Sequence, residues 1–406
     1  MSLHPILSSL RKHRVAASLI VLEIAFSCAV VCNALFLIDQ RLERMHRPSG
    51  VAEQELVQLR TRSVVKDGNS AALTQSDLDA LRRIPGVRDA SSINMALFGD
   101  SIGYSGVSLQ PDQERSTLHA VHYFGDAHLL DTLGLRLIAG RGFRADEFVD
   151  EAQLTSTVDK RAPPAVILSQ ALAERLFPGR DAVGRSLYVF GEHRVVGVVE
   201  RLVQPRDMGA ESQYDFAMLF PVNVASSRST YLLRVRDPAQ REAVLRQAKA
   251  VLQHQGPRRM IRSAKTLEQA RADYYRSDQA MAWLLVGVSA ALLLVTALGI
   301  VGLTSFWVQQ RTKQIGIRRA LGATCGQILR HFQLENFLLA STGIVLGMLL
   351  AYAANLYLMS AYELPRLPLW YLPVGALVLW LLGQLAVLPP ARRAAAVPPA
   401  VATRSV

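Results

Sequence analysis

Four long apolar blocks alternate with polar sequence along the chain, over residues 15–38, 282–308, 337–359 and 369–388. A helix needs about 20 predominantly apolar residues to cross a bilayer, so each block predicts a transmembrane helix. The first block is longer than the apolar core of a secretory signal, which has roughly 7–15 residues, and we expect it to remain as an anchor. The pattern therefore predicts an α-helical membrane protein and excludes a purely soluble one.

Small and polar residues within these blocks carry further expectations. Gly343 and Gly347 are interpreted as places where neighbouring helices approach closely. Cys28 and Cys32 lie one helical turn apart and are expected to be small packing residues. Glu23 leaves two interpretations open, because a carboxylate in an apolar span is costly. It either faces the interior of the helix bundle, where it could be functional, or it extends to the membrane surface or pairs with Arg14.

The segment before the first block has a helical pattern of its own. Leu3, Ile6, Leu7 and Leu10 follow the i, i+3, i+4, i+7 spacing of an amphipathic helix. This spacing predicts an interfacial helix on the membrane surface. The alternative is a basic leader without regular structure.

Basic residues gather in the short segments beside the apolar blocks. Residues 1–14, 309–331 and 389–406 together hold eleven basic and no acidic side chains. The positive-inside rule then places both termini and the 309–331 loop in the cytoplasm, with residues 39–281 facing outward. The outward segment holds 33 basic and 30 acidic residues, so the net charge of +12 reflects membrane topology and does not indicate a nucleic-acid partner.

The outward segment alternates strand-like and helical patterns. Residues 53–62 and 87–94 read as strands around a helix that Thr74 could N-cap and that runs to Ile84. A matching half follows much later, with a strand at 231–235 and a helix at 238–253. Short β-like runs, Gly and Pro fill the sequence between the two halves. We therefore expect a large extracytoplasmic α+β domain with a β-rich subdomain inserted in it.

These patterns predict five regions along the chain. No proline separates residues 266–281 from the second apolar block, so a continuous stalk helix is expected there. The expected regions are 1–38 with the interfacial and first transmembrane helices, 39–265 with the α+β domain, 266–281 with the stalk helix, 282–388 with three transmembrane helices, and 389–406 as a cytoplasmic tail.

Familiar catalytic and metal-binding patterns are missing from the sequence. No lysine follows a glycine, so a phosphate-binding loop of the G-x-x-x-x-G-K type is absent. His119, His122 and His128 with Asp126 are the nearest approach to a metal cluster. On a strand, however, His119 and His122 would point to opposite faces, and the spacing fits no common zinc pattern. We expect no catalytic residue, no cofactor site and no metal site in this chain.

The loop between the second and third apolar blocks has the most specific sequence. A short basic helix is expected up to a break at Gly322 and Ala323. Thr324 with Gln327 three residues later predicts a capping box that opens the next long helix. A helix joined to two membrane spans in this way is a mechanical handle; the alternative is a charged loop that only fixes topology.

The residues of this loop resemble the signature of the FtsX/MacB-type ABC transporter permeases. The resemblance rests on Arg311-Thr312, on residues 315–323 with the sequence IGIRRALGA, and on Glu335. Residues 123–143, 166–199 and 390–404 are similar to the family's periplasmic and C-terminal motifs, so the likeness extends along the whole chain. Gln310 and Gln314 stand where the family usually has glutamates.

The resemblance implies that the chain is the permease subunit of a MacB-like transporter of the mechanotransmission type. Residues 282–388 would form the FtsX-like permease domain and residues 39–265 the MacB-like periplasmic core domain. The chain would work in the bacterial inner membrane with a separate ABC ATPase that binds ATP and Mg²⁺, and with a second permease subunit, in a homo- or heterodimer. A periplasmic adaptor is a further partner that the resemblance allows. ATP hydrolysis would drive efflux or extraction of a substrate on the periplasmic side.

The coupling to the ATPase is assigned by the same resemblance to nine residues of the loop. They are Arg311, Thr312, Ile315, Gly316, Arg318, Arg319, Leu321, Gly322 and Ala323. The alternative function is a non-transporting transmembrane regulator or receptor, such as an FtsX-like activator of a periplasmic hydrolase.

Overall fold

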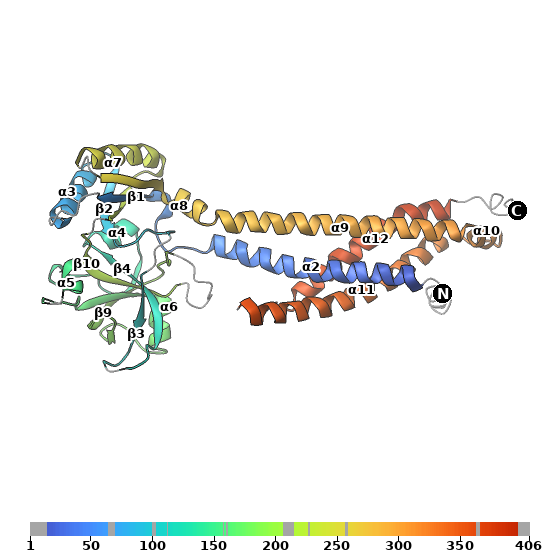
Figure 1. Ribbon diagram of the computed structural model, residues 1–406, viewed down its shortest axis with the longest axis horizontal. Coiled ribbons are helices and arrows are strands. Elements are labelled where there is room, and N and C mark those ends of the chain that lie inside the picture. The colour runs from blue at the N-terminus through green and yellow to red at the C-terminus, as the bar shows by residue number, and fades with distance from the viewer. Residues whose placement is uncertain are drawn as a thin grey trace. The chain divides into compact units, whose positions relative to one another are not determined.

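The computed structural model of the chain forms two compact units, one of residues 1–46 with 277–406 and one of residues 47–276 (Figure 1). We call them the helical unit and the sheet unit. The residues that the structure describes are 14–63, 70–99, 103–111, 113–156, 158–159, 161–205, 215–225, 228–255, 259–362 and 366–396. The interfacial helix expected at residues 3–10 lies outside them.

The helical unit contains four helices that are long and apolar enough to cross a membrane, as the four blocks predicted. Its helices are α2 (Arg14–His46), α9 (Arg276–Gln310), α10 (Thr312–Ala320), α11 (Cys325–Tyr362) and α12 (Tyr371–Ala395). Each long helix extends beyond its apolar block. At the C-terminal end, α12 continues through Pro389 and Pro390 to Ala395, so the expected tail begins as helix.

Small residues bring α2, α11 and α12 into close contact. A Cβ atom built on Gly347 of α11 would lie 2.5 Å from the Cβ of Cys28, and Gly375 of α12 meets the sulfur of Cys32. Both cysteines are fully buried. The packing interpretation of these cysteines and of Gly347 is confirmed, because no larger side chain fits between the backbones.

Helix α9 is much less buried than the other spans. In the most apolar 18-residue stretch of α9, 11% is buried in the structure, against 50% in the corresponding stretch of α2. Polar contacts join the two helices: an ion pair links Arg41 of α2 to Asp278 of α9, and the buried hydroxyls of Ser27 and Thr296 lie 2.7 Å apart. A large part of the apolar surface of α9 thus remains open to lipid or to a partner.

Glu23 lies at the same seam between α2 and α9. Its carboxylate oxygens would be 2.5 and 2.7 Å from a Cβ atom built on Gly299 of α9. This position favours the interpretation in which the carboxylate faces the helix bundle, because Gly299 leaves the space that the carboxylate fills.

The sheet unit is a twelve-stranded sheet with helices, and its first lobe is a split β-α-β arrangement. The strands of this lobe are β1 (Leu56–Ser63), β2 (Val87–Ile93), β11 (Thr230–Val235) and β12 (Arg259–Thr266), and its helices are α3 (Ser70–Arg82) and α7 (Arg241–Gln255). The order β12-β1-β11-β2 interleaves the two halves in antiparallel register. The predicted strands and helices of both halves are confirmed, with ends shifted by a few residues.

Helices α3 and α7 lie beside each other over the first lobe (Figure 1), and they bury Leu78, Leu81, Val244 and Leu252 against the strands. The expected N-cap at Thr74 is wrong. Helix α3 already begins at Ser70, and the Thr74 hydroxyl donates instead to the Ser70 carbonyl, at 2.9 Å. A threonine inside a helix commonly bonds back to the preceding turn in this way.

The second lobe lies between β2 and β11 in the sequence and has a hydrophobic core of its own. Its strands are β3 (Tyr104–Val107), β4 (Leu118–Gly125), β5 (Leu137–Gly140), β6 (Val149–Asp150), β7 (Ala165–Ser169), β8 (Ser186–Tyr188), β9 (Glu192–Val199) and β10 (Ala217–Asn223), and its helices are α4 (Leu129–Leu133), α5 (Glu151–Thr155) and α6 (Gln170–Leu176). The two lobes join where β2 pairs β4, and this pairing is recorded at one position, Ile93 with Gly125. Strand pairing therefore ties the lobes together over a short distance only.

The stalk expected at residues 266–281 is interrupted. Helix α8 (Leu267–Tyr274) ends where Tyr275 leaves helical geometry, and α9 starts at Arg276. Tyr275 is 5% exposed and packs against Phe98, and the Arg271 guanidinium lies over both rings. These contacts within the sheet unit hold Tyr275 in place, so tertiary packing overrides the local preference for a continuous helix.

Candidate functional site

The junction between α9 and α10 is a single residue. Arg311 has a φ of −103° and a ψ of 7°, and helical geometry resumes at Thr312. The Thr312 hydroxyl lies 3.0 and 2.9 Å from the carbonyl oxygens of Val308 and Gln309 and can donate to either, so it helps to satisfy the carbonyl groups in the last turn of α9. The predicted short helix is therefore present and starts in a sharply defined turn.

The end of α10 and the start of α11 follow the predicted signals. Gly322 has a φ of +97°, and the amide of Ala323 bonds to the carbonyl of Arg318 at 3.0 Å, which together form a Schellman cap. The Gln327 amide then bonds to the Thr324 hydroxyl, and the Gln327 side chain accepts a bond from the Thr324 amide. The predicted break and capping box are confirmed.

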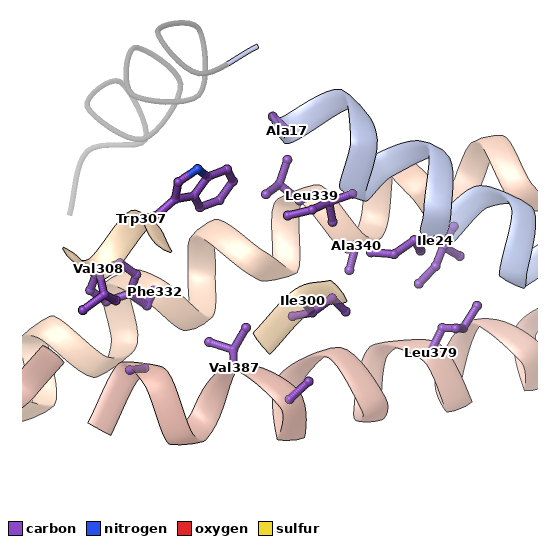
Figure 2. Close-up of a cluster of buried hydrophobic side chains, with 14 of the residues drawn as sticks. Ala17, Ile24, Ile300, Trp307, Val308, Phe332, Leu339, Ala340, Leu379 and Val387 are labelled. Atoms are coloured by element: carbon purple, nitrogen blue, oxygen red, sulfur yellow. The ribbon is translucent and has the colours of Figure 1, made fainter. Parts of the chain in front are cut away.

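One face of α10 packs into the helical unit. Ile315 and Gly316 are buried, and Ile315 belongs to the same core as Val308 of α9 and Phe332 of α11. Figure 2 shows Val308 against Phe332 at the end of this core. The burial of this face fixes which side of the helix remains available.

Arg311 also points inward, toward a buried acid on α11. Its Nη1 atom lies 3.2 and 3.1 Å from the two carboxylate oxygens of Glu335, and the two side chains are only 14% and 2% exposed. The guanidinium carbon is 5.9 Å from the centre of the Trp307 ring, in the last turn of α9. This charge is neutralised inside the protein, so it is not presented at the surface for a partner.

The opposite face of α10 is exposed and mixed in character. Gln314, Ile317, Arg318 and Leu321 occupy it at i, i+3, i+4, i+7 spacing. The Leu321 side chain is 83% exposed and that of Ile317 48%. Two large apolar side chains beside a guanidinium, on a short capped helix, form a surface that a protein partner could cover.

The structure thus divides the nine predicted coupling residues into two groups. Arg318 and Leu321 lie on the exposed face. The other predicted residues hold the helix in place or lie beside its caps, and they are Arg311, Thr312, Ile315, Gly316, Arg319, Gly322 and Ala323. Ile317 belongs to the exposed face although it is absent from the predicted set. Its position four residues before Leu321 is the sequence signal that would have found it.

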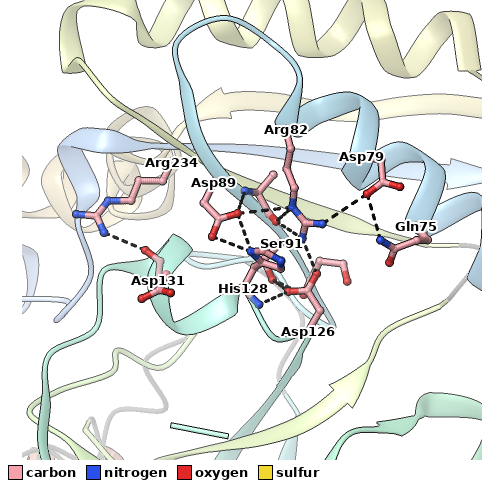
Figure 3. A network of polar contacts seen from close by, with 11 residues as sticks. Gln75, Asp79, Arg82, Asp89, Ser91, Asp126, His128, Asp131 and Arg234 are labelled. Atoms are coloured by element: carbon pink, nitrogen blue, oxygen red, sulfur yellow. Dashed lines mark hydrogen bonds and ion pairs between the residues drawn. The ribbon is translucent and has the colours of Figure 1, made fainter. Parts of the chain in front are cut away.

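A polar network joins the two lobes of the sheet unit at their short strand pairing (Figure 3). Arg82 of α3 donates to the Ala90 carbonyl at 2.7 Å and to Asp126, after β4, at 3.3 Å. The Ser91 hydroxyl of β2 also donates to Asp126, at 2.6 Å. Burial raises the pKa of the Asp126 carboxyl, and Ser91 and Arg82 oppose that rise. The network therefore adds a second connection between the lobes beside the strand pair.

The histidines singled out in the sequence lie in separate environments. His119 stacks on Tyr104, His122 bonds to the Ser105 hydroxyl at 3.0 Å, and His128 pairs with Asp89. Burial lowers the pKa of His122 to about 4. Among the described residues, no group of three or more His, Cys, Asp and Glu is arranged to hold a metal ion.

The similarity to the periplasmic motif at residues 139–143 has a structural explanation. Gly140 has a φ of +73°, and its backbone packs directly on the carbonyl of Val196 in β9, where no side chain fits. Arg141 forms an ion pair with Glu147 at its own turn. That guanidinium lowers the pKa of the Glu147 carboxyl. These residues shape the edge strand β5 and the turn that follows it.

Both units match protein families of ABC transporter permeases. Residues 286–399 match the FtsX-like permease C-terminal family, and residues 18–251 match the MacB-like periplasmic core domain family. The chain is 22% identical to the uncharacterized ABC transporter permease YknZ of Bacillus subtilis, over 98% of this chain and 97% of that protein. It is 25% identical to the macrolide export ATP-binding/permease protein MacB of Nitrosomonas europaea, over 97% of this chain and 57% of MacB. It therefore spans nearly all of YknZ and little more than half of MacB.

Proposed function

This chain belongs to the ABC transporter permeases that combine a MacB-like periplasmic core domain with an FtsX-like permease domain, and we propose that it couples a separate ABC ATPase to work on a substrate outside the inner membrane. The observation that carries the proposal is the exposed face of α10. ATP and Mg²⁺ would be bound by the ATPase. The sheet unit would act on the substrate, in efflux or extraction.

The exposed face of α10 has the chemistry of a docking element. Apolar side chains that are buried at the centre of an interface usually supply most of the affinity, and charges at the rim supply orientation. Ile317 and Leu321 would be the apolar anchors, and Arg318 would meet an acidic group of the ATPase. The inward face of α10 already packs in the helical unit, so force on the outer face would reach the membrane helices.

The position of α10 in the chain supports transmission in two directions. Arg311 alone separates it from α9, and four residues separate it from α11. Through α9 the chain continues into the sheet unit at Tyr275. Both membrane helices beside α10 would therefore respond to a movement of this element.

A second permease subunit is the other partner that we propose. Leu284, Leu294 and Leu298 of α9 are each about 60% exposed, at 58%, 62% and 61%. An ATPase that works as a pair would need two permease halves, and α9 has apolar surface that a second copy or a related chain would cover. Cysteine substitution at Leu298 and mild oxidation in native membranes would give a dimer if α9 faces α9.

The experiment that tests the coupling proposal compares two surface variants. Full-length chain is isolated from native membranes, and any bound ABC ATPase is identified by mass spectrometry. We expect Leu321→Glu to lower recovery of the ATPase by about tenfold, because a carboxylate would be desolvated in an apolar contact. The matched control is Arg330→Glu, which changes an exposed residue of α11 outside the α10 face.

Two results would contradict the proposal. One is the recovery of equal amounts of ATPase with Leu321→Glu and with the unchanged chain. The other is that the unchanged chain brings down a different class of protein, such as a sensor kinase, and no ABC ATPase.

A further inference from the structure

We propose that the Arg311–Glu335 ion pair sets the orientation of α10, so that α9, α10 and α11 move together when the exposed face of α10 is displaced. The inference rests on the proposed function only for its consequence in transport. The orientation itself is a property of this chain. Arg311 and Glu335 are positioning residues in this proposal, because neither lies on the exposed face.

The first argument is the geometry of the joint. Arg311 is the one residue between α9 and α10 that lacks helical geometry. A one-residue joint between two helices has few backbone bonds to resist bending. Here the amide of Arg311 bonds to the carbonyls of Trp307 and Val308, at 3.1 and 3.2 Å, which fixes the joint to α9 but not to α11.

The second argument is where the guanidinium lies. It contacts the Trp307 ring of α9 and both carboxylate oxygens of Glu335 on α11. A single side chain, anchored at the start of α10, therefore touches both neighbouring helices. Removal of its partner would release α11 from this point.

The third argument separates this pair from ordinary packing. Ile315 and Gly316 bury the inner face of α10, but apolar contacts have no preferred direction and allow a short helix to rotate or slide. A charged hydrogen bond is directional, and a carboxylate that is 2% exposed strongly favours the one arrangement in which it is paired. Packing thus keeps α10 against the unit, and the ion pair selects its angle.

The experiment measures the orientation of α10 directly. Spin labels are attached to cysteines placed at Gln314 of α10 and Arg330 of α11, which are both exposed. Cys325 is replaced by serine because it is exposed, whereas Cys28 and Cys32 are buried. The full chain is reconstituted in lipid nanodiscs, and paramagnetic resonance gives the distribution of distances between the labels.

Three variants are compared with the unchanged pair. Glu335→Gln should widen the distribution at least about twofold, because the buried guanidinium loses its counter-charge. Arg311→Lys keeps the charge but loses the planar fork, so it should give an intermediate width. The control Lys313→Gln removes an exposed charge of α10 and should leave the width unchanged. If Glu335→Gln does not insert into the membrane, Arg311→Lys still tests the proposal.

A distribution as narrow in both pair variants as in the unchanged chain would overturn the proposal. A lower unfolding temperature without any widening would also overturn it, since the pair would then be only structural. The orientation measurement needs no ATPase, so it stands even if the proposed function fails.

Where the unchanged chain does bind an ABC ATPase, hydrolysis by the complex gives a second readout. Glu335→Gln should lower kcat about tenfold and leave the KM for ATP within about twofold, because α10 would still bind but transmit poorly. Equal loss of ATPase binding in Glu335→Gln and Leu321→Glu would contradict a positioning role.

Discussion

Two ion-pair arrangements connect elements that are otherwise loosely joined, and they differ in how the charge is shared. In the helical unit, Arg311 meets the carboxylate of Glu335 in a largely buried site. In the sheet unit, Arg82 lies among Asp79, Asp89 and Asp126 and also donates to a backbone carbonyl (Figure 3). The buried pair depends strongly on each of its members. The network spreads the charge over several partially exposed groups and should tolerate the loss of one of them.

The largest effect is expected from removing one member of the buried pair. Arg311→Met leaves the Glu335 carboxylate buried without this partner, and we expect the stability of the helical unit to fall by about 3 kcal/mol. Thermal unfolding of the full chain in nanodiscs measures this loss. The double variant Arg311→Met/Glu335→Leu should recover most of the stability, because neither charge of the pair remains buried without the other. If the double variant is as unstable as the single one, the loss comes from packing.

A smaller effect is expected from the centre of the network. Arg82→Met should cost about 2 kcal/mol, because Ala90 and Asp126 lose a donor but solvent and Ser91 compensate in part. Hydrogen exchange of the amides in β2 and β4 locates the change. Faster exchange confined to α3 would show that Arg82 does not help to join the lobes.

A third effect is expected when the pH is lowered, and it concerns the stability of the sheet unit. Burial holds the pKa of His122 at about 4, below the unfolded value of 6.5, so the unfolded chain binds the proton first as the pH falls. The stability that neutral His122 provides is fully present above pH 6.5 and is lost between pH 6.5 and about 4. We expect a loss on the order of 2 kcal/mol over this range.

Unfolding of the sheet unit measured across this pH range tests the expectation. His122→Phe should flatten the profile, because Phe124 and Phe190 already surround the ring. A profile that is equally steep without His122 would assign the acid response to other groups.

The smallest effect is expected at the edge of the network. Asp79 is 3.7 Å from Arg82 and half exposed, so Asp79→Asn should change stability by less than about 0.5 kcal/mol. The difference is measured by comparing the unfolding of Asp79→Asn with that of Arg82→Met. A loss as large as that of Arg82→Met would mean that the network is as sensitive to single changes as the buried pair.

The sequence predicts the elements of both regions better than their contacts. The four spans follow from the apolar blocks, and the ends of α10 follow from Gly322, Thr324 and Gln327, because these signals are local. The break at Tyr275 could not be predicted, since it depends on packing against Phe98, which comes from a distant part of the sequence. The N-cap prediction at Thr74 failed although its signal was local. Its hydroxyl suits a cap, but the chain places Ser70 at the helix start.

In the candidate site, too, the elements could be predicted from the sequence and the contacts could not. The residues of the α9–α10–α11 junction are recognisable as a group from the signature at 311–323. Which of them are exposed could not be predicted, because Arg311 is turned inward by Glu335. That glutamate lies 24 residues later, on α11. Helical spacing places Ile317 on the same face as Leu321, but that this face is the exposed one follows only from the structure.

The most direct test of the account is a cross-link from α10 to its partner. A photoreactive benzoylphenylalanine is introduced at Leu321, at Ile317 or, as a control, at the exposed Arg330, and native membranes are irradiated. The account predicts a covalent product with an ABC ATPase from Leu321 and Ile317 and far less from Arg330. Equal labelling from all three positions, or products that contain no ABC ATPase, would contradict it.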